Sequence, residues 1–127
     1  MNYGHVSYTS HDDHTEIHLL FPTDLFERLC VVHNVQLDVL TEASVQTLFV
    51  DVLGKWQHGA VSTEDLSSIA NFLWTKIDKQ TELASRLIDA AELSYYIRHA
   101  KDERTSATLS QFVARLASFY KPKQDVD

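Results

Sequence analysis

The sequence is short of the residues that make tight turns and covalent cross-links. Its 127 residues include three glycines, two prolines and a single cysteine, Cys30. So few glycines and prolines leave little material for the turns of a many-stranded sandwich, which favours helices joined by short connections. A lone cysteine cannot form an internal disulfide, so we expect a reducing, cytoplasmic setting.

Long apolar runs are also missing. No stretch approaches the roughly 20 consecutive apolar residues that a membrane-spanning helix needs. Residues 1–10 have neither the basic nor the apolar region of a secretory signal. Hydrophobic residues make up 44 % and charged residues 23 % of the chain, which is ordinary for a globular protein. We therefore expect a globular domain that does not enter a membrane.

Apolar residues recur mostly at helical spacing. Period-two alternation over residues 15–21 predicts one short strand, and Pro22 should end it because proline cannot donate to a ladder. The helical segments that follow have expected caps at Thr23, Thr41, Ser62 and Thr81. The first helical stripe is Leu25, Phe26, Leu29 and Val32; a later one includes Ala91 and Ile97; the last is Leu109, Phe112, Val113, Leu116 and Phe119.

The predicted fold class is mainly α, with about five helices and one short N-terminal β-strand. A single helical domain is expected over residues 15–120, between a flexible polar leader at 1–14 and a frayed tail at 121–127. Residues 64–99 could form one helix or two, since no glycine or proline forces a break. We favour a break near Asp78, because a single helix of that length is unusual in a compact domain.

Acidic side chains outnumber basic ones, and the excess lies in the first half. The formal net charge is −7; residues 1–60 hold eight acidic and two basic residues, and residues 61–127 are nearly balanced. An acidic half repels phosphate and attracts basic surfaces. We therefore expect a basic protein partner and no nucleic acid. The plainer interpretation of each single acidic residue is that it belongs to a solvated face that keeps the protein soluble. The residues expected to steer that partner are led by Asp12, Asp13, Glu16 and Asp24.

Seven histidines raise the question of a metal site. His11, His14 and His18 lie close together in the sequence, and Asp12 and Asp13 add oxygen ligands. A zinc site needs three or four ligands within about 2.0–2.3 Å of one ion, and a polar leader explains the same residues without one. We expect no metal and no cofactor.

The chain shows no catalytic constellation. Cys30 precedes His33 by three residues, but its apolar neighbours predict a small buried hydrophobe rather than a reactive thiol. The adjacent carboxylates Glu64 and Asp65 lie at an expected helix start, where negative charge is stabilising without any function. Three scattered glycines cannot form a phosphate-binding loop. We expect a binding protein rather than an enzyme.

Two adjacent tyrosines are candidate partner contacts. Because Tyr95 and Tyr96 are neighbours in an expected helix, at least one should face away from the core. Tyrosine is enriched at protein interfaces, but helical cores also use aromatic residues. Tyr95 or Tyr96 is therefore a candidate binding residue, with plain packing as the alternative.

Residues 15–56 resemble a ribbon-helix-helix module. The strand, proline-containing turn and first helix run from Glu16 through Pro22 to Leu29, and the second helix starts at Thr41. The resemblance implies an obligate dimer with paired N-terminal strands that binds DNA as a transcriptional regulator. In that family the outward strand residues, usually basic or amide-bearing, enter the major groove; here the matching positions are Glu16, His18 and Leu20.

In overall character the chain is similar to bacterial immunity proteins, which are small, acidic and helical and neutralise basic toxins by masking them. The leading hypothesis is a non-catalytic, immunity- or antitoxin-like inhibitor or regulator that masks a basic protein. Electrostatic steering would bring the partner in, and a few aromatic anchors would then be buried. The alternatives are a dimeric ribbon-helix-helix DNA-binding regulator and a structural subunit that pairs through its helices, either of which could be a homodimer.

Overall fold

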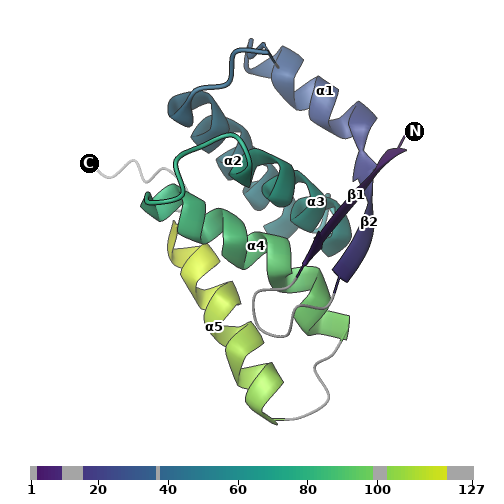
Figure 1. Cartoon of the computed structure of the whole chain (residues 1–127), viewed down its shortest axis with the longest axis vertical. Helices are drawn as coiled ribbons and strands as arrows, with labels where there is room; N and C mark the ends of the chain where they lie inside the picture. Colours follow the sequence, from purple (N-terminus) through teal and green to yellow (C-terminus); the bar gives the residue numbers. More distant parts are fainter. Residues whose placement is uncertain (1–2, 10–15, 37, 99–102, 120–127) are drawn as a thin grey trace.

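The computed structural model describes residues 3–9, 16–36, 38–98 and 103–119. This part of the chain is mainly helical, as predicted (Figure 1). Its elements in chain order are β1 (Tyr3–Thr9), β2 (Glu16–Pro22), α1 (Thr23–Val32), α2 (Glu42–Gln57), α3 (Thr63–Trp74), α4 (Glu82–Arg98) and α5 (Glu103–Phe119). None of the described helices is long and apolar enough to cross a lipid bilayer.

The two strands form an antiparallel pair. Tyr3 lies opposite Pro22 at one end and Thr9 opposite Glu16 at the other. The alternation in the sequence predicted β2 correctly, but β1 corrects the assignment of its residues to a flexible leader. β1 was missed because its own apolar pattern is weak, and a strand's preference depends strongly on the neighbour it pairs with.

Helix starts follow the local capping chemistry at three of the four expected positions, Thr41, Ser62 and Thr81. The side chains of Thr41 and Ser62 each accept a hydrogen bond at 3.1 Å from the backbone amide three residues ahead. The expected cap at Thr23 is wrong, because α1 begins at Thr23 itself. The Thr23 hydroxyl instead donates to the carbonyl oxygen of Phe21 at 3.4 Å.

The long helical stretch is broken near Asp78, as favoured from the sequence. α3 ends before this connection and α4 begins after it. The Asp78 carboxylate accepts from the backbone amide of Gln80 at 3.0 Å, and the Thr81 hydroxyl accepts from the amide of Ala84 at 3.1 Å. Side-chain capping therefore makes the break without glycine or proline.

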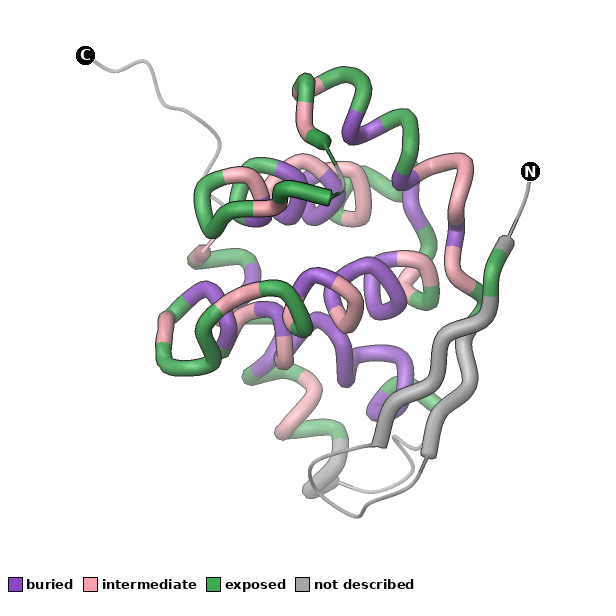
Figure 2. Tube along the Cα trace, turned by 45° about the horizontal axis from the view of Figure 1, so that its top comes forward, coloured by how far each residue is buried: buried purple, intermediate pink, exposed green. Residues whose placement is uncertain are grey.

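The core lies between the helices. α4 packs against α3 on one side and α5 on the other, while β2 packs against α3 and α1 lies at the edge beside α2 and β1 (Figure 1). Buried positions gather on the sides of the helices that face one another (Figure 2). The largest fully buried side chains include Leu48, Phe49, Leu53, Leu66, Ile69, Leu73, Leu87, Leu93 and Leu116.

Three residues of the expected apolar stripes are exposed instead of buried. They are Val32, Ile97 and Val113. Val32 and Ile97 lie in the last turns of α1 and α4, where no described element covers them, and Val113 lies at the margin of the α5 stripe beside the buried Phe112. A period-3.6 pattern identifies the apolar side of a helix but does not say how much of that side its neighbours reach.

Candidate functional site

One side of α1 combines exposed apolar and charged groups. A shallow groove of about 550 Å³ is lined by Asp24, Glu27, Arg28, Val31 and Val32, which we call the α1 face. These residues follow one another at intervals of three, one, three and one, so they share one side of the helix. The side chains of Val31 and Val32 are 79 % and 72 % exposed. Clustered exposed apolar groups of this kind mark interaction sites more often than isolated ones do.

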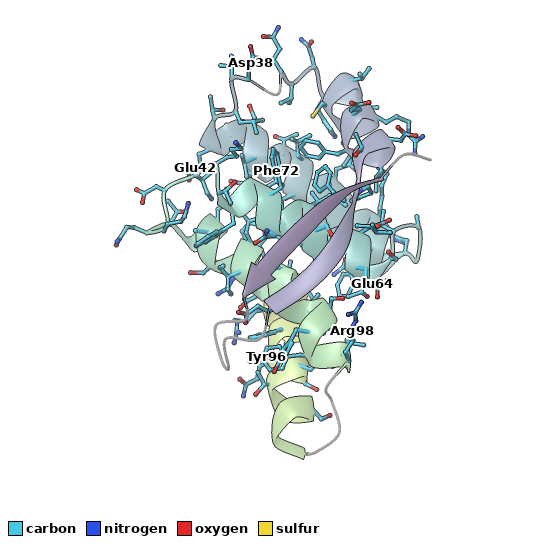
Figure 3. All side chains as sticks on the ribbon, turned by 45° about the vertical axis from the view of Figure 1, so that its right-hand side comes forward. Asp38, Glu42, Glu64, Phe72, Tyr96 and Arg98 are labelled. Carbon is cyan, nitrogen blue, oxygen red and sulfur yellow. The ribbon has the colours of Figure 1, made fainter. Side chains whose placement is uncertain are left out.

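Carboxylates dominate the charge around the α1 face. Asp24 and Glu27 outnumber Arg28 on the face itself. Asp38 lies beyond the end of α1, in the connection to α2, and Glu42 lies in the first turn of α2; both are exposed (Figure 3). The exposed apolar residues of α1 therefore share their face with two carboxylates and one cation.

The inner side of α1 is anchored near its first residue by aromatic packing. The Phe21 ring lies 5.5 Å from Phe26 and 5.5 Å from Phe72, and Phe26 lies 5.3 Å from Phe72. These three rings join β2, α1 and α3 in one cluster. The Ser68 hydroxyl adds a hydrogen bond at 3.2 Å to the carbonyl oxygen of Leu20. The start of α1 is thus held on α3.

A charged cluster holds the other end of α1. His33, just after α1, lies with its Nε2 atom 2.6 Å from an oxygen of Asp51 in α2. Lys55, one turn along α2, binds the other oxygen of Asp51. Burial raises the pKa of Asp51, but the hydrogen bonds and charges of Lys55 and His33 outweigh this effect and lower the pKa overall.

The same cluster lines a groove of about 650 Å³. Its walls include His33, Asp51, Lys55 and His58. The Nδ1 atom of His58 lies 2.8 Å from the carbonyl oxygen of Gly54, so this nitrogen is the donor. Asp51 is shared between His33 and Lys55, which ties the end of α1 to α2.

Cys30 does not join this cluster. It is buried, and burial together with the nearby charge of Glu27 raises its pKa, which disfavours the reactive thiolate. His33, the partner considered for it, is bound to Asp51. The prediction that Cys30 behaves as a small buried hydrophobe is confirmed.

The acidic residues predicted to steer a partner have different outcomes. Asp24 lies on the α1 face. Asp12 and Asp13 lie outside the described residues, as does the side chain of Glu16, whose backbone belongs to β2. The structure therefore places one of the four in a candidate site.

Among the histidines considered for metal binding, His11 and His14 also lie outside the described residues, and only the backbone of His18 is described. Within the described ranges, no three histidine, cysteine, aspartate or glutamate residues come together in a way that could hold a metal ion.

The expectation that Tyr95 or Tyr96 faces away from the core is wrong. Their exposed fractions are 7 % and 5 %. Their rings meet edge to face at 5.2 Å, and Tyr96 meets Phe112 of α5 at 5.1 Å. Both are covered because α4 lies between α3 and α5, so two sides of α4 are buried rather than one. Figure 3 places Tyr96 at the opposite end of the molecule from Asp38.

Two residues of the α1 face, Val31 and Val32, could not be recognised from the sequence. Val31 was given no role and Val32 was assigned to the core, because an exposed valine and a buried one look alike in a helical pattern.

Comparison with family models, curated proteins and solved structures found nothing that matches this chain.

Proposed function

We propose that this protein is a non-catalytic inhibitor or regulator that binds a basic protein partner through its α1 face. The observation that carries the proposal is the exposure of Val31 and Val32 beside the carboxylates of Asp24 and Glu27. Protein interfaces typically combine a desolvated apolar centre with a polar rim. The acidic rim selects a basic partner and repels an acidic one.

The two kinds of residue would have different effects on binding. Burying a valine side chain fully is worth roughly 1.5–3 kcal/mol, so Val31 and Val32 would lengthen the life of the complex. The carboxylates would mainly speed association, and that effect would weaken as salt is added. This division replaces the predicted tyrosine anchors, which are buried, with valine anchors.

The DNA-binding alternative has less support. The ribbon-helix-helix resemblance implies that the N-terminal strands of two copies pair, whereas β2 here pairs with β1 of the same chain. The α1 face carries two carboxylates against one cation, and this excess of negative charge repels a phosphate backbone. A cytoplasmic location, expected from the lone cysteine, belongs to the same proposal.

The test is a comparative capture from the native cytoplasm at low salt, with nuclease added. The variant is the double substitution Val31→Ser and Val32→Ser, and the matched control is Val113→Ser, which alters an exposed valine on α5. We expect wild type and the control to retain the same basic protein and the double variant to lose it. Equal capture by all three would refute the α1 face as the docking surface. Recovery of DNA that is lost at moderate salt would instead support the regulator.

Association kinetics with the captured protein test the steering charges. Glu27→Lys reverses a charge on the α1 face, and Glu82→Lys makes the same change at the exposed start of α4. We expect Glu27→Lys to slow association roughly tenfold at low salt and Glu82→Lys to have much less effect. An equal effect of the two reversals would mean that net charge, not the α1 face, attracts the partner.

A further inference from the structure

One pocket of this acidic protein concentrates positive charge. It lies where the end of α3, the start of α4 and α5 meet, and its volume is about 430 Å³. Lys79, Arg86 and Arg115 line it, together with a single carboxylate, Asp89. Two positive charges therefore remain after Asp89 is neutralised. The chain as a whole carries −7, so the pocket opposes the overall charge.

The two arginines share the buried carboxylate. Asp89 is 5 % exposed, and the Nε and Nη2 atoms of Arg115 donate to its two oxygens at 3.0 and 3.1 Å. The Nε atom of Arg86 lies 3.2 Å from one of these oxygens, yet this buried N–H has no hydrogen-bond acceptor among the described residues. Buried donors without acceptors are rare in native proteins and call for an explanation.

Lys79 is held at the rim of the pocket. Its ammonium group donates to the carbonyl oxygens of Trp74 at 2.9 Å and Ile77 at 3.1 Å, and it lies 4.4 Å from the centre of the Trp74 ring. An ammonium group has three N–H donors, so these two bonds leave one available. The lysine is thus placed before any ligand arrives.

We propose that this pocket binds the phosphate group of a small phosphate monoester. Guanidinium groups present planar pairs of N–H donors that match phosphate oxygens, and lysine adds a point charge. The volume exceeds that of a phosphate group alone, and Trp74, Ala84 and Ile88 give the pocket an apolar wall for the organic part of the ester. Asp89 keeps the guanidinium groups in place and competes with the ligand for them.

The first experiment is an NMR titration at constant ionic strength with inorganic phosphate and with phenyl phosphate, following the arginine Nε–H signals. We expect Arg86 and Arg115 to shift with both probes, and phenyl phosphate to bind roughly tenfold more tightly because its ring covers the apolar wall. Shifts with inorganic phosphate alone would restrict the site to the free ion and overturn the ester proposal. No shift at either arginine would overturn the site altogether.

Variants separate local binding from general attraction. Lys79→Gln removes a pocket cation, whereas Lys76→Gln removes a lysine that lies over Phe72 and does not line the pocket. We expect Lys79→Gln to weaken phenyl phosphate binding roughly tenfold and Lys76→Gln to leave it within about twofold. If both substitutions weakened phenyl phosphate binding equally, the general charge of the protein would explain the binding and the proposed site would be refuted. Arg86→Gln gives a second loss of a pocket cation if Lys79→Gln folds poorly.

Asp89→Asn distinguishes a ligand site from a purely structural network. Removing the competing negative charge should tighten phenyl phosphate binding several-fold and increase the rise in melting temperature that this ligand produces. If the arginines serve only to neutralise Asp89, the substitution lowers the melting temperature and added phenyl phosphate does not restore it. That result would overturn the proposal.

Discussion

Replacing Asp51 with asparagine should loosen α1 from α2 and destabilise the protein. Asp51 is the shared partner of His33 and Lys55 and joins the end of α1 to α2. Asparagine has nearly the same shape but no charge, so Asp51→Asn removes the charge with little change in packing. The substitution also bears on the proposed function, because the α1 face belongs to the helix that this contact holds.

The size of the effect follows from the exposure of the three side chains. His33 and Asp51 are 27 % and 17 % exposed, and a hydrogen bond to a charged group in such a setting is worth about 1.5–3 kcal/mol. Lys55 is 44 % exposed and lies one turn from Asp51, so solvent screening limits that pair to about 0.3–0.5 kcal/mol. Asparagine can still accept hydrogen bonds. We therefore expect the free energy of unfolding to fall by about 2 kcal/mol at pH 6.

The pH dependence has a defined sign. The pKa of Asp51 is lowered in the folded protein, so its charge contributes stability above the unfolded pKa of about 3.9. This contribution is lost as the pH falls through the lower folded pKa, where Asp51 takes up a proton and resembles asparagine. The difference in the free energy of unfolding between wild type and Asp51→Asn should therefore reach its full size at pH 6 and shrink steadily below about pH 4.

The assay is urea unfolding followed by circular dichroism at several pH values, with amide exchange of α1 as a local measure. Glu64→Gln is the matched control, because it removes the carboxylate of an ion pair with Arg98 in which both partners are about half exposed. That pair should be worth less than about 0.5 kcal/mol. A loss for Glu64→Gln as large as the loss for Asp51→Asn would refute the reasoning, as would unchanged amide exchange in α1.

Three further predictions concern buried groups. Tyr96→Phe should leave the free energy of unfolding unchanged or raise it by up to about 1 kcal/mol, because the buried Tyr96 hydroxyl has no hydrogen-bond partner among the described residues. Urea unfolding measures the change, and a decrease of more than about 1 kcal/mol would show that the hydroxyl does have a partner. Ser67→Ala should lower the free energy of unfolding by about 1–2 kcal/mol, because the Ser67 hydroxyl donates to the carbonyl oxygen of Ala90 at 2.9 Å and accepts from the amide of Ser94 at 3.2 Å. Calorimetry measures this loss. No loss would mean that the Ala90 carbonyl and the Ser94 amide bond to each other when the serine is absent. Cys30 should react with a thiol reagent at least about 100-fold more slowly than free cysteine, since it is buried and its pKa is raised, and urea should remove this protection.

The sequence predicted those features of the fold that depend on a few neighbouring residues. The caps at Thr41 and Ser62 and the break after Asp78 need only a side-chain oxygen within three residues of a free backbone amide. Cys30 was placed correctly, and it lies one helical turn after the buried Phe26, but the same apolar stretch did not reveal that Val31 and Val32 are exposed. The predictions were wrong for features that depend on residues far apart in the chain. β1 depends on β2 for its backbone hydrogen bonds, and the adjacent tyrosines are both buried only because α5 covers α4.

The same distinction explains which parts of the candidate sites could be anticipated. Composition located the acidic excess in the first half, and the α1 face lies there. The positive pocket could not be anticipated, because the second half is nearly neutral and its charges separate only in three dimensions. Asp89 and Arg115 are 26 residues apart, and the packing of α5 on α4 brings them together. Net charge therefore predicts a partner only for a surface whose charged residues are neighbours in the chain. The proposed basic partner at the α1 face could thus be anticipated from composition, whereas the proposed anion site at α4 and α5 depends on packing.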